Sequence, residues 1–151
     1  MTLPRRAVIL GAAGRDFHDF NVAYRDDPGV QVVAFTAAQI PGIAGRRYPA
    51  ALAGPRYPAG IPIVDEAALP DLCRRERVTE VVFAYSDVPH AHVMRLASQA
   101  LAAGADFVLP GPTRADEPAR RRHPARAGAS CSRSRRPPNA IVFGSSLVPL
   151  R

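Results

Sequence analysis

Residues 7–16 of the chain read AVILGAAGRD, a short apolar run followed at once by a glycine-rich turn. Four consecutive apolar residues fit a strand buried on both faces, as the strands of parallel sheets are. After the turn, Phe17, Phe20 and Tyr24 recur at helical spacing, and residues 26–29 (DDPG) predict where that helix ends. A strand, a glycine turn and a helix in this order predict the first half of a βαβ unit.

The same alternation continues to Pro112 and predicts an α/β domain. Further apolar, β-branched runs predict strands at residues 31–36, 61–64, 80–85 and 106–109. The clearest helical pattern spans residues 89–103, with Gly104 as its cap, and a second lies around residues 69–73, where Pro70 obscures its start. Strands alternating with helices predict a Rossmann-like, doubly wound, mainly parallel sheet of about five strands.

The charge divides the chain in two. Residues 1–112 hold 11 Arg and 11 acidic residues, whereas residues 113–151 hold 9 Arg and 2 acidic residues and so carry the whole net charge of +7. Residues 113–138 contain 8 Arg, 4 Pro and 3 Ser, and no Leu, Ile, Val, Met, Phe, Tyr or Trp. Such a segment buries too little apolar surface to offset the entropy of ordering. We therefore expect a domain at residues 1–112 and a disordered, basic, low-complexity tail at residues 113–151. Within this tail, residues 140–143 are either a last strand or an apolar end without defined secondary structure.

The number of cysteines indicates the redox state of the cellular compartment. Cys73 and Cys131 are too few for a disulfide framework and form no CxxC pair, which favours a reducing interior. The apolar run at residues 7–10 is too short for an export signal, and nothing approaches the ~20 apolar residues of a membrane span. We expect a cytoplasmic protein with no membrane partner.

The glycine turn at residues 11–14 is the first candidate site. A turn between a strand and a helix points backbone N–H groups at an anion, and glycine lets the ligand approach closely. The dinucleotide pattern GxGxxG is not met, since Ala13 and Asp16 stand where its second and third glycines belong. A phosphate group therefore fits better than NAD, and a tight turn without a ligand is the alternative.

A second loop, Ser86 to Pro89, follows the apolar run at residues 80–85. If the strand order reverses beside the first strand, this loop and the glycine turn face each other across the crevice where doubly wound sheets bind ligands. The same residues also suit a helix start, with Ser86 or Asp87 as N-cap and Pro89 in the first turn. Both interpretations stay open.

Residues 36–60 are long for a connection and rich in Pro and Gly, with Arg-Tyr-Pro at residues 47–49 and again at 56–58. Either this segment takes part in function, as long loops often do, or its two tyrosines pack on the domain.

Histidines and arginines near these turns are candidate partners for phosphate, because imidazole and guanidinium groups donate hydrogen bonds to its oxygens. His90 and His92 are two residues apart, so they do not form the i, i+4 pair of a metal site on a helix. The candidate ligand-binding residues are Gly11, Ala12, Ala13, Gly14, Arg15, Asp16, His18, Arg46, Arg47, Ser86, Asp87 and His90. No catalytic residue and no metal ligand is predicted.

Six stretches carry a family resemblance: residues 8–21 (VILGAAGRDFHDFN), 33–36 (VAFT), 39–43 (QIPGI), 46–49 (RRYP), 60–63 (GIPI) and 82–88 (VFAYSDV). Together they resemble the N-terminal region of the cyclic 2,3-diphosphoglycerate synthetase family, whose members are often labelled GTPases or P-loop proteins. The resemblance covers residues 5–112. It implies a Rossmann-like domain joined, in the family, to a P-loop domain. It also implies ATP-dependent closure of an intramolecular phosphoanhydride in 2,3-diphosphoglycerate, with Mg²⁺.

The chain departs from this family after Pro112. The family continues into a P-loop ending in Gly-Lys-Ser, whereas these 151 residues contain no GxxxxGK[ST] pattern and no Lys. We expect a truncated or frame-shifted member, because out-of-frame reading of GC-rich DNA yields Arg, Pro, Ala and Ser. Such a chain would bind a phosphorylated ligand without being catalytic alone, and its expected partners are that ligand and the missing P-loop domain.

Two other functions stay open. Residues 120–122 and 133–136 offer arginines to nucleic-acid phosphates, but residues 113–138 contain no Phe, Tyr or Trp to stack on bases, so a nucleic-acid partner is not expected. The topology alone also allows an NAD(P)- or CoA-binding module. A homodimer is compatible with the sequence.

Overall fold

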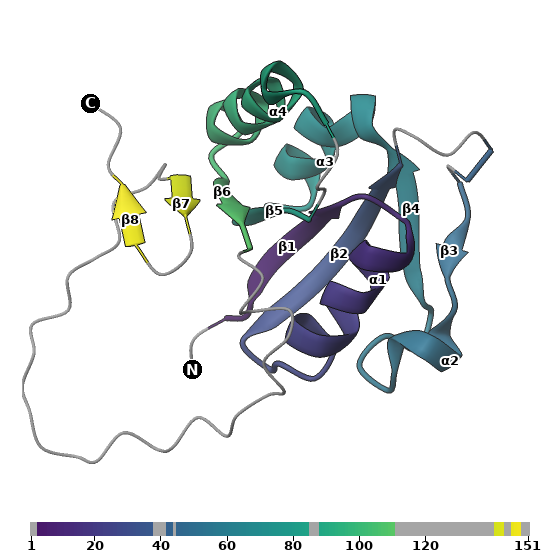
Figure 1. Ribbon diagram of the computed structural model, residues 1–151. Coiled ribbons are helices and arrows are strands. Elements are labelled where there is room, and N and C mark those ends of the chain that lie inside the picture. The colour runs from purple at the N-terminus through teal and green to yellow at the C-terminus, as the bar shows by residue number, and fades with distance from the viewer. Residues whose placement is uncertain are drawn as a thin grey trace, which may run out of the picture.

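The computed structural model describes residues 3–37, 42–43, 45–84, 88–110, 141–143 and 146–148, the last two segments by their backbone only. Its centre is an eight-stranded sheet in the order β3-β4-β2-β1-β5-β6-β7-β8 (Figure 1). The strands are β1 (Arg5–Leu10), β2 (Val30–Ala37), β3 (Arg47–Tyr48), β4 (Ile61–Asp65), β5 (Glu80–Phe83), β6 (Asp106–Leu109), β7 (Ile141–Phe143) and β8 (Ser146–Val148). Six of them, from β4 to β7 in the sheet order, run parallel, and the two edge strands are antiparallel to their neighbours.

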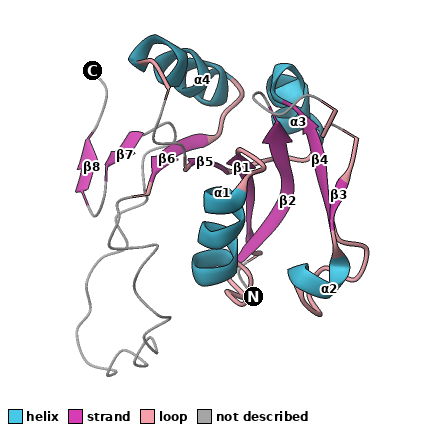
Figure 2. Ribbon diagram, turned by 45° about the vertical axis from the view of Figure 1, so that its right-hand side comes forward, coloured by secondary structure: helices cyan, strands magenta, loops and turns pink. Residues whose placement is uncertain are grey.

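Helices lie on both faces of this sheet (Figure 2). They are α1 (Gly14–Asp19), the π-helical turn η1 (Phe20–Tyr24), α2 (Ala50–Ala53), the 3-10 turn η2 (Glu66–Ala68), α3 (Leu69–Arg75) and α4 (His90–Ala102). The first two are continuous and pack on one face, whereas α3 and α4 pack on the other. The predicted Rossmann-like, doubly wound, mainly parallel sheet is confirmed.

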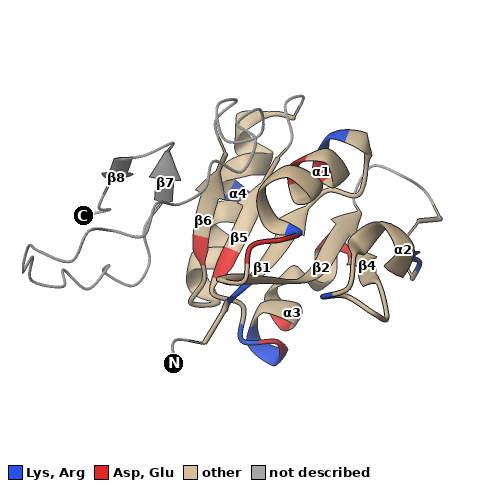
Figure 3. Cartoon of the chain, turned by 90° about the horizontal axis from the view of Figure 1, so that it is seen from below, with Lys and Arg blue, Asp and Glu red and all other residues tan. Residues whose placement is uncertain are grey.

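Burial on both faces explains the apolar run of β1. Ala7 and Ile9 pack toward α1 and η1, while Val8 and Leu10 pack toward α3 and α4, and all four are fully buried. Burying each large side chain of this kind contributes roughly 1.5–3 kcal/mol. Charged residues lie at strand ends and on helices, and the middle of the central strands carries none (Figure 3).

The helix predicted at residues 89–103 is confirmed as α4. It begins after Pro89, whose extended backbone precedes the first helical residue, and it ends before Gly104, which has a φ of +84°. The predicted apolar stripe faces the sheet, with Leu96, Ala97 and Ala100 buried. The helix predicted around residues 69–73 is also present, and Pro70 lies in its first turn, where a missing N–H does no harm.

The segment before β4 packs on the domain through its tyrosines. Tyr48 and Tyr57 are buried and join an aromatic cluster whose ring centroids lie 4.6–5.7 Å apart. The members of this aromatic cluster are Phe17, Phe20, Phe35, Tyr48 and Tyr57. Of the two interpretations of this segment, packing is therefore confirmed. The segment is not one open loop, because it contains β3 and α2.

Two strand boundaries differ from prediction by two residues, and those of β2 and β4 differ by one. The first strand begins at Arg5 rather than Ala7. Arg5 is ion-paired with Glu80 and Arg6 with Glu76, so these two charged residues can extend the amino end of β1. The strand predicted to reach Tyr85 ends at Phe83, and Tyr85 lies outside the described residues. Residues 141–143 form a strand beside β6, while residues 113–138 of the predicted tail lie outside the described part of the chain.

Candidate functional site

The candidate site lies where the strand order reverses. The bend after β1 and the carboxyl end of β5 are neighbours, because Leu10 pairs with Phe83. From β1 the chain crosses to β2 through α1 on one face, and from β4 it crosses to β5 through α3 on the other. Ligands of doubly wound sheets bind in this position.

Gly11 begins the bend in a backbone conformation that residues with a side chain rarely adopt. Its φ is +119°, and its N–H donates to the carbonyl oxygen of Thr36 at 3.1 Å and to the Oγ1 of the same residue at 3.3 Å. A Cβ placed on Gly11 would lie 2.3 Å from Oδ2 of Asp16. Glycine is therefore required here both for its conformation and for the space that the Asp16 carboxylate fills.

Asp16 turns its carboxylate into the bend instead of outward. The side chain is only 2% exposed, and Oδ2 accepts the N–H of Ala13 at 2.9 Å. Ala13 precedes the helix and Asp16 is its third residue, so this bond is one half of a capping box. Burial raises the pKa of Asp16 from 3.8 to about 6; the Ala13 N–H opposes the rise, nearby Asp19 adds to it, and Arg15 opposes it.

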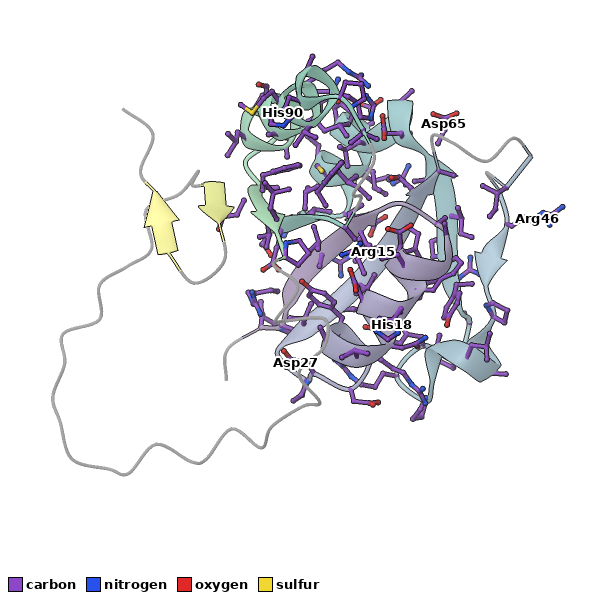
Figure 4. The ribbon with its side chains drawn as sticks, in the orientation of Figure 1. Arg15, His18, Asp27, Arg46, Asp65 and His90 are labelled. Atoms are coloured by element: carbon purple, nitrogen blue, oxygen red, sulfur yellow. The ribbon has the colours of Figure 1, made fainter. Side chains whose placement is uncertain are left out.

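The outer rim of the bend is exposed. Ala13, Gly14, Arg15 and His18 all face solvent, and a Cβ on Gly14 would meet nothing within 4 Å. Arg15 lies at the start of α1 and His18 farther along it (Figure 4). Within the described residues, the N–H groups of Gly11 and Ala13 are used internally, while no described residue accepts the N–H of Gly14. A ligand anion could therefore meet the bend only from its outer side.

The structure does not bring the two predicted arginines of the 46–47 pair to this bend. Arg47 lies on β3, the outer strand, with β4 and β2 between it and β1. Its guanidinium donates to the carbonyl oxygens of Ala59 at 2.8 Å and Gly60 at 3.2 Å, just before β4 begins. Arg46 points outward from the same edge (Figure 4). The structure therefore places Arg46 and Arg47 at the β3 edge of the sheet and not beside the glycine turn.

The second predicted loop is described only in part. Ser86 and Asp87 lie outside the described residues. His90 is exposed at the start of α4, at the same edge of the sheet as the bend (Figure 4).

One charged cluster was not predicted. Buried Glu66, in the turn after β4, holds Nε2 of His92 at 3.2 Å and a guanidinium nitrogen of Arg95 at 3.3 Å. Arg95 also reaches Nδ1 of His92 at 3.0 Å, so both ring nitrogens of this histidine are engaged. These contacts tie η2 to α4, and their one sequence signal is the acidic pair Asp65-Glu66 that follows the strand predicted at residues 61–64.

Two searches of the described residues were negative. No group of three or more His, Cys, Asp or Glu side chains in them is arranged to hold a metal ion. None of their helices is long and apolar enough to pass through a membrane.

No protein-family model matches the chain. The chain is similar to a curated protein, the arginine synthetase ArcE of Thermococcus kodakarensis, with 60% identity over 108 residues. The match covers 72% of this chain but only 24% of the relative, so the chain spans about a quarter of that protein.

Solved structures of a Rex-family repressor, RSP, share the fold. RSP superposes with a TM-score of 0.55 at 14% identity over 72% of this chain and 46% of RSP. Its complex with β-NADH gives the same TM-score and identity and covers 47% of that chain. At this identity the likeness concerns the fold alone, and it agrees with the Rossmann-like topology described above.

Proposed function

We propose that this chain is the Rossmann-like region of a synthetase and that it binds a phosphorylated ligand on the outer side of the β1–α1 bend. The 60% identity to a curated synthetase over 108 residues carries the proposal. The location of the ligand is supported by the exposed rim of the bend, which lies where the strand order reverses and has Arg15 beside it.

Two reactions are candidates for the longer enzyme. The curated relative is named for arginine synthesis. The resemblance of residues 5–112 to cyclic 2,3-diphosphoglycerate synthetases favours phosphoanhydride closure in 2,3-diphosphoglycerate. The two differ in the ligand that the region would hold, so ligand binding separates them.

We place ATP and Mg²⁺ in a P-loop domain outside this chain. The sequence has no Gly-Lys-Ser loop to hold a triphosphate, and the described residues offer no metal-binding cluster. The described residues therefore lack a P-loop that would hold a Mg²⁺–triphosphate complex, and no step through ATP or Mg²⁺ is derived for them. On this proposal the region contributes binding, and bond formation requires the partner domain.

The proposal is tested by calorimetric titration of the 151-residue chain with 2,3-diphosphoglycerate, ATP, arginine and NADH. We expect heat with a phosphorylated ligand and about fivefold weaker binding in Arg15→Gln, the value of an exposed ion pair near 1 kcal/mol. Arg46→Gln is the matched control, because it removes the same charge at the distant sheet edge (Figure 4). No heat with either 2,3-diphosphoglycerate or ATP, or equal weakening in both variants, refutes the proposed site.

Heat with NADH alone would instead support a nicotinamide-binding module, and heat with arginine alone would place an amino-acid site in this region.

A further inference from the structure

The inner half of the bend is already occupied by a negative group of the protein itself. The three nearest atoms to a Cβ on Gly11 all belong to the Asp16 carboxylate, at 2.3–2.5 Å. The same carboxylate takes the N–H of Ala13, which would otherwise point at a ligand anion. An anion at the outer rim therefore approaches a buried carboxylate of like charge.

The surroundings of Asp16 do not neutralise it fully. The charged groups that act on it are Asp19, on the next turn of the same helix, and Arg15, its neighbour at the exposed rim. From the facing strands, the bend presents Gly11 and the end of β2 presents Thr36, neither of which titrates. Burial and Asp19 hold the pKa of Asp16 near 6, so its charge changes close to neutral pH.

We propose that Asp16 is a specificity-determining residue that opposes anion binding at the β1–α1 bend while it is charged and permits it when it is neutral. This inference rests on the proposed function. The physical reason is repulsion between the ligand anion and the carboxylate, whose burial keeps water from screening it fully. Tight binding near neutral pH then requires a ligand that neutralises Asp16 or brings a cation or a proton with it.

The test is the affinity of the full chain for sulfate between pH 5 and 7.5, measured for the wild type, Asp16→Asn and two controls. Sulfate serves as the probe because it does not change its own charge in this range, unlike phosphate. Asparagine keeps the oxygen that accepts the Ala13 N–H and removes only the charge.

Asp27→Asn is the matched control. Oδ1 of Asp27 accepts the N–H of Gly29 at 2.8 Å, so the substitution also neutralises a carboxylate bonded to the backbone. Asp27 lies at the opposite end of the strands from Arg15 (Figure 4). His18→Gln removes the exposed imidazole of α1 and tests whether this side chain accounts for the pH profile.

We expect wild-type affinity for sulfate to rise on the order of tenfold as the pH falls from 7.5 to 5. Asp16→Asn should bind sulfate at pH 5 and at pH 7.5 with the affinity that the wild type shows at pH 5. Both controls should keep the wild-type pH profile. Circular dichroism of each variant confirms that the fold is kept.

A pH profile that is the same in the wild type and Asp16→Asn, with sulfate bound in both, overturns this inference and leaves the proposed site standing. A profile lost in His18→Gln also overturns it. Absence of sulfate, 2,3-diphosphoglycerate and ATP binding in every protein at every pH overturns the proposed function and this inference with it.

Discussion

Replacing Gly11 with alanine should destabilise the domain by about 3 kcal/mol. A residue with a Cβ at the observed φ of +119° carries strain of about 1–3 kcal/mol. The new methyl group would also lie 2.3 Å from Oδ2 of Asp16, so the carboxylate must move. Its displacement also removes the acceptor of the Ala13 N–H, a loss of about 0.5–1.5 kcal/mol because Ala13 is exposed and water can replace the carboxylate.

Urea denaturation of Gly11→Ala, Gly14→Ala and the double variant Gly11→Ala/Asp16→Ala measures these contributions. Gly14→Ala is the matched control, because its Cβ would meet nothing within 4 Å and its φ is not positive, so its free energy of unfolding should be equal to or above that of the wild type. Removing the Asp16 side chain relieves the collision but still leaves the strain and the lost acceptor of the Ala13 N–H, so the double variant should be no less stable than Gly11→Ala. A surface substitution without structural effect changes the free energy of unfolding by about 0.5 kcal/mol or less. If the free energy of unfolding of Gly11→Ala lies within that range of the wild type, the reasoning about this bend is wrong.

Three further predictions follow from buried groups. Native Asp16 holds its proton more tightly than the unfolded chain, since its pKa rises from 3.8 to about 6, so its stabilising contribution is complete below pH 3.8 and is lost as the pH rises through 6. The free energy of unfolding of the wild type should therefore fall by about 3 kcal/mol more than that of Asp16→Asn between pH 3.5 and 7.5, and parallel urea profiles would contradict this. Tyr57→Phe removes the hydroxyl that accepts the N–H of Val32 at 3.1 Å, which should lower the midpoint of urea unfolding by the equivalent of about 1–3 kcal/mol, and an unchanged midpoint would count against that bond. Burial raises the pKa of the Cys73 thiol to about 11, so in a Cys131→Ser background a disulfide reagent should label it only after denaturation, and fast labelling of the folded protein would show that the site is open.

Periodicity predicted the parallel strands and α4 because these elements are decided by local patterns. The run at residues 7–10 is apolar throughout since both faces of β1 are covered, and the stripe from Leu96 to Ala100 is spaced for one helical face. Gly104 and Pro89 mark the ends of α4 through their own backbone preferences. None of these features depends on residues far away in the sequence.

The short strand β3 could not be predicted because it depends on distant contacts. It has only two residues, and it lies beside β4 since Gly60 allows the backbone of Tyr48 to approach: a Cβ on Gly60 would be 2.3 Å from the Tyr48 carbonyl oxygen. The same close approach positions the carbonyls that bind Arg47. The guanidinium of Arg47 therefore bonds to the backbone at the edge of the sheet.

At the glycine bend, residue types predicted the place but not the direction of one side chain. An acidic residue at the third position of a helix is equally consistent with contacting a ligand and with capping the helix. Burial of Asp16 against Gly11 decides in favour of capping, and that burial is a property of the assembled layers. A sequence pattern alone does not contain it.

The aromatic cluster gives the protein an intrinsic optical reporter. The chain has no tryptophan and four tyrosines, so its near-ultraviolet emission is tyrosine emission. Phe17 directly follows Asp16 on α1, and its ring is stacked on that of Tyr48 with a centroid separation of 4.6 Å. Any ligand that shifts the start of α1 also shifts this ring, and the event can be followed in the unlabelled protein by the brightness of its tyrosines.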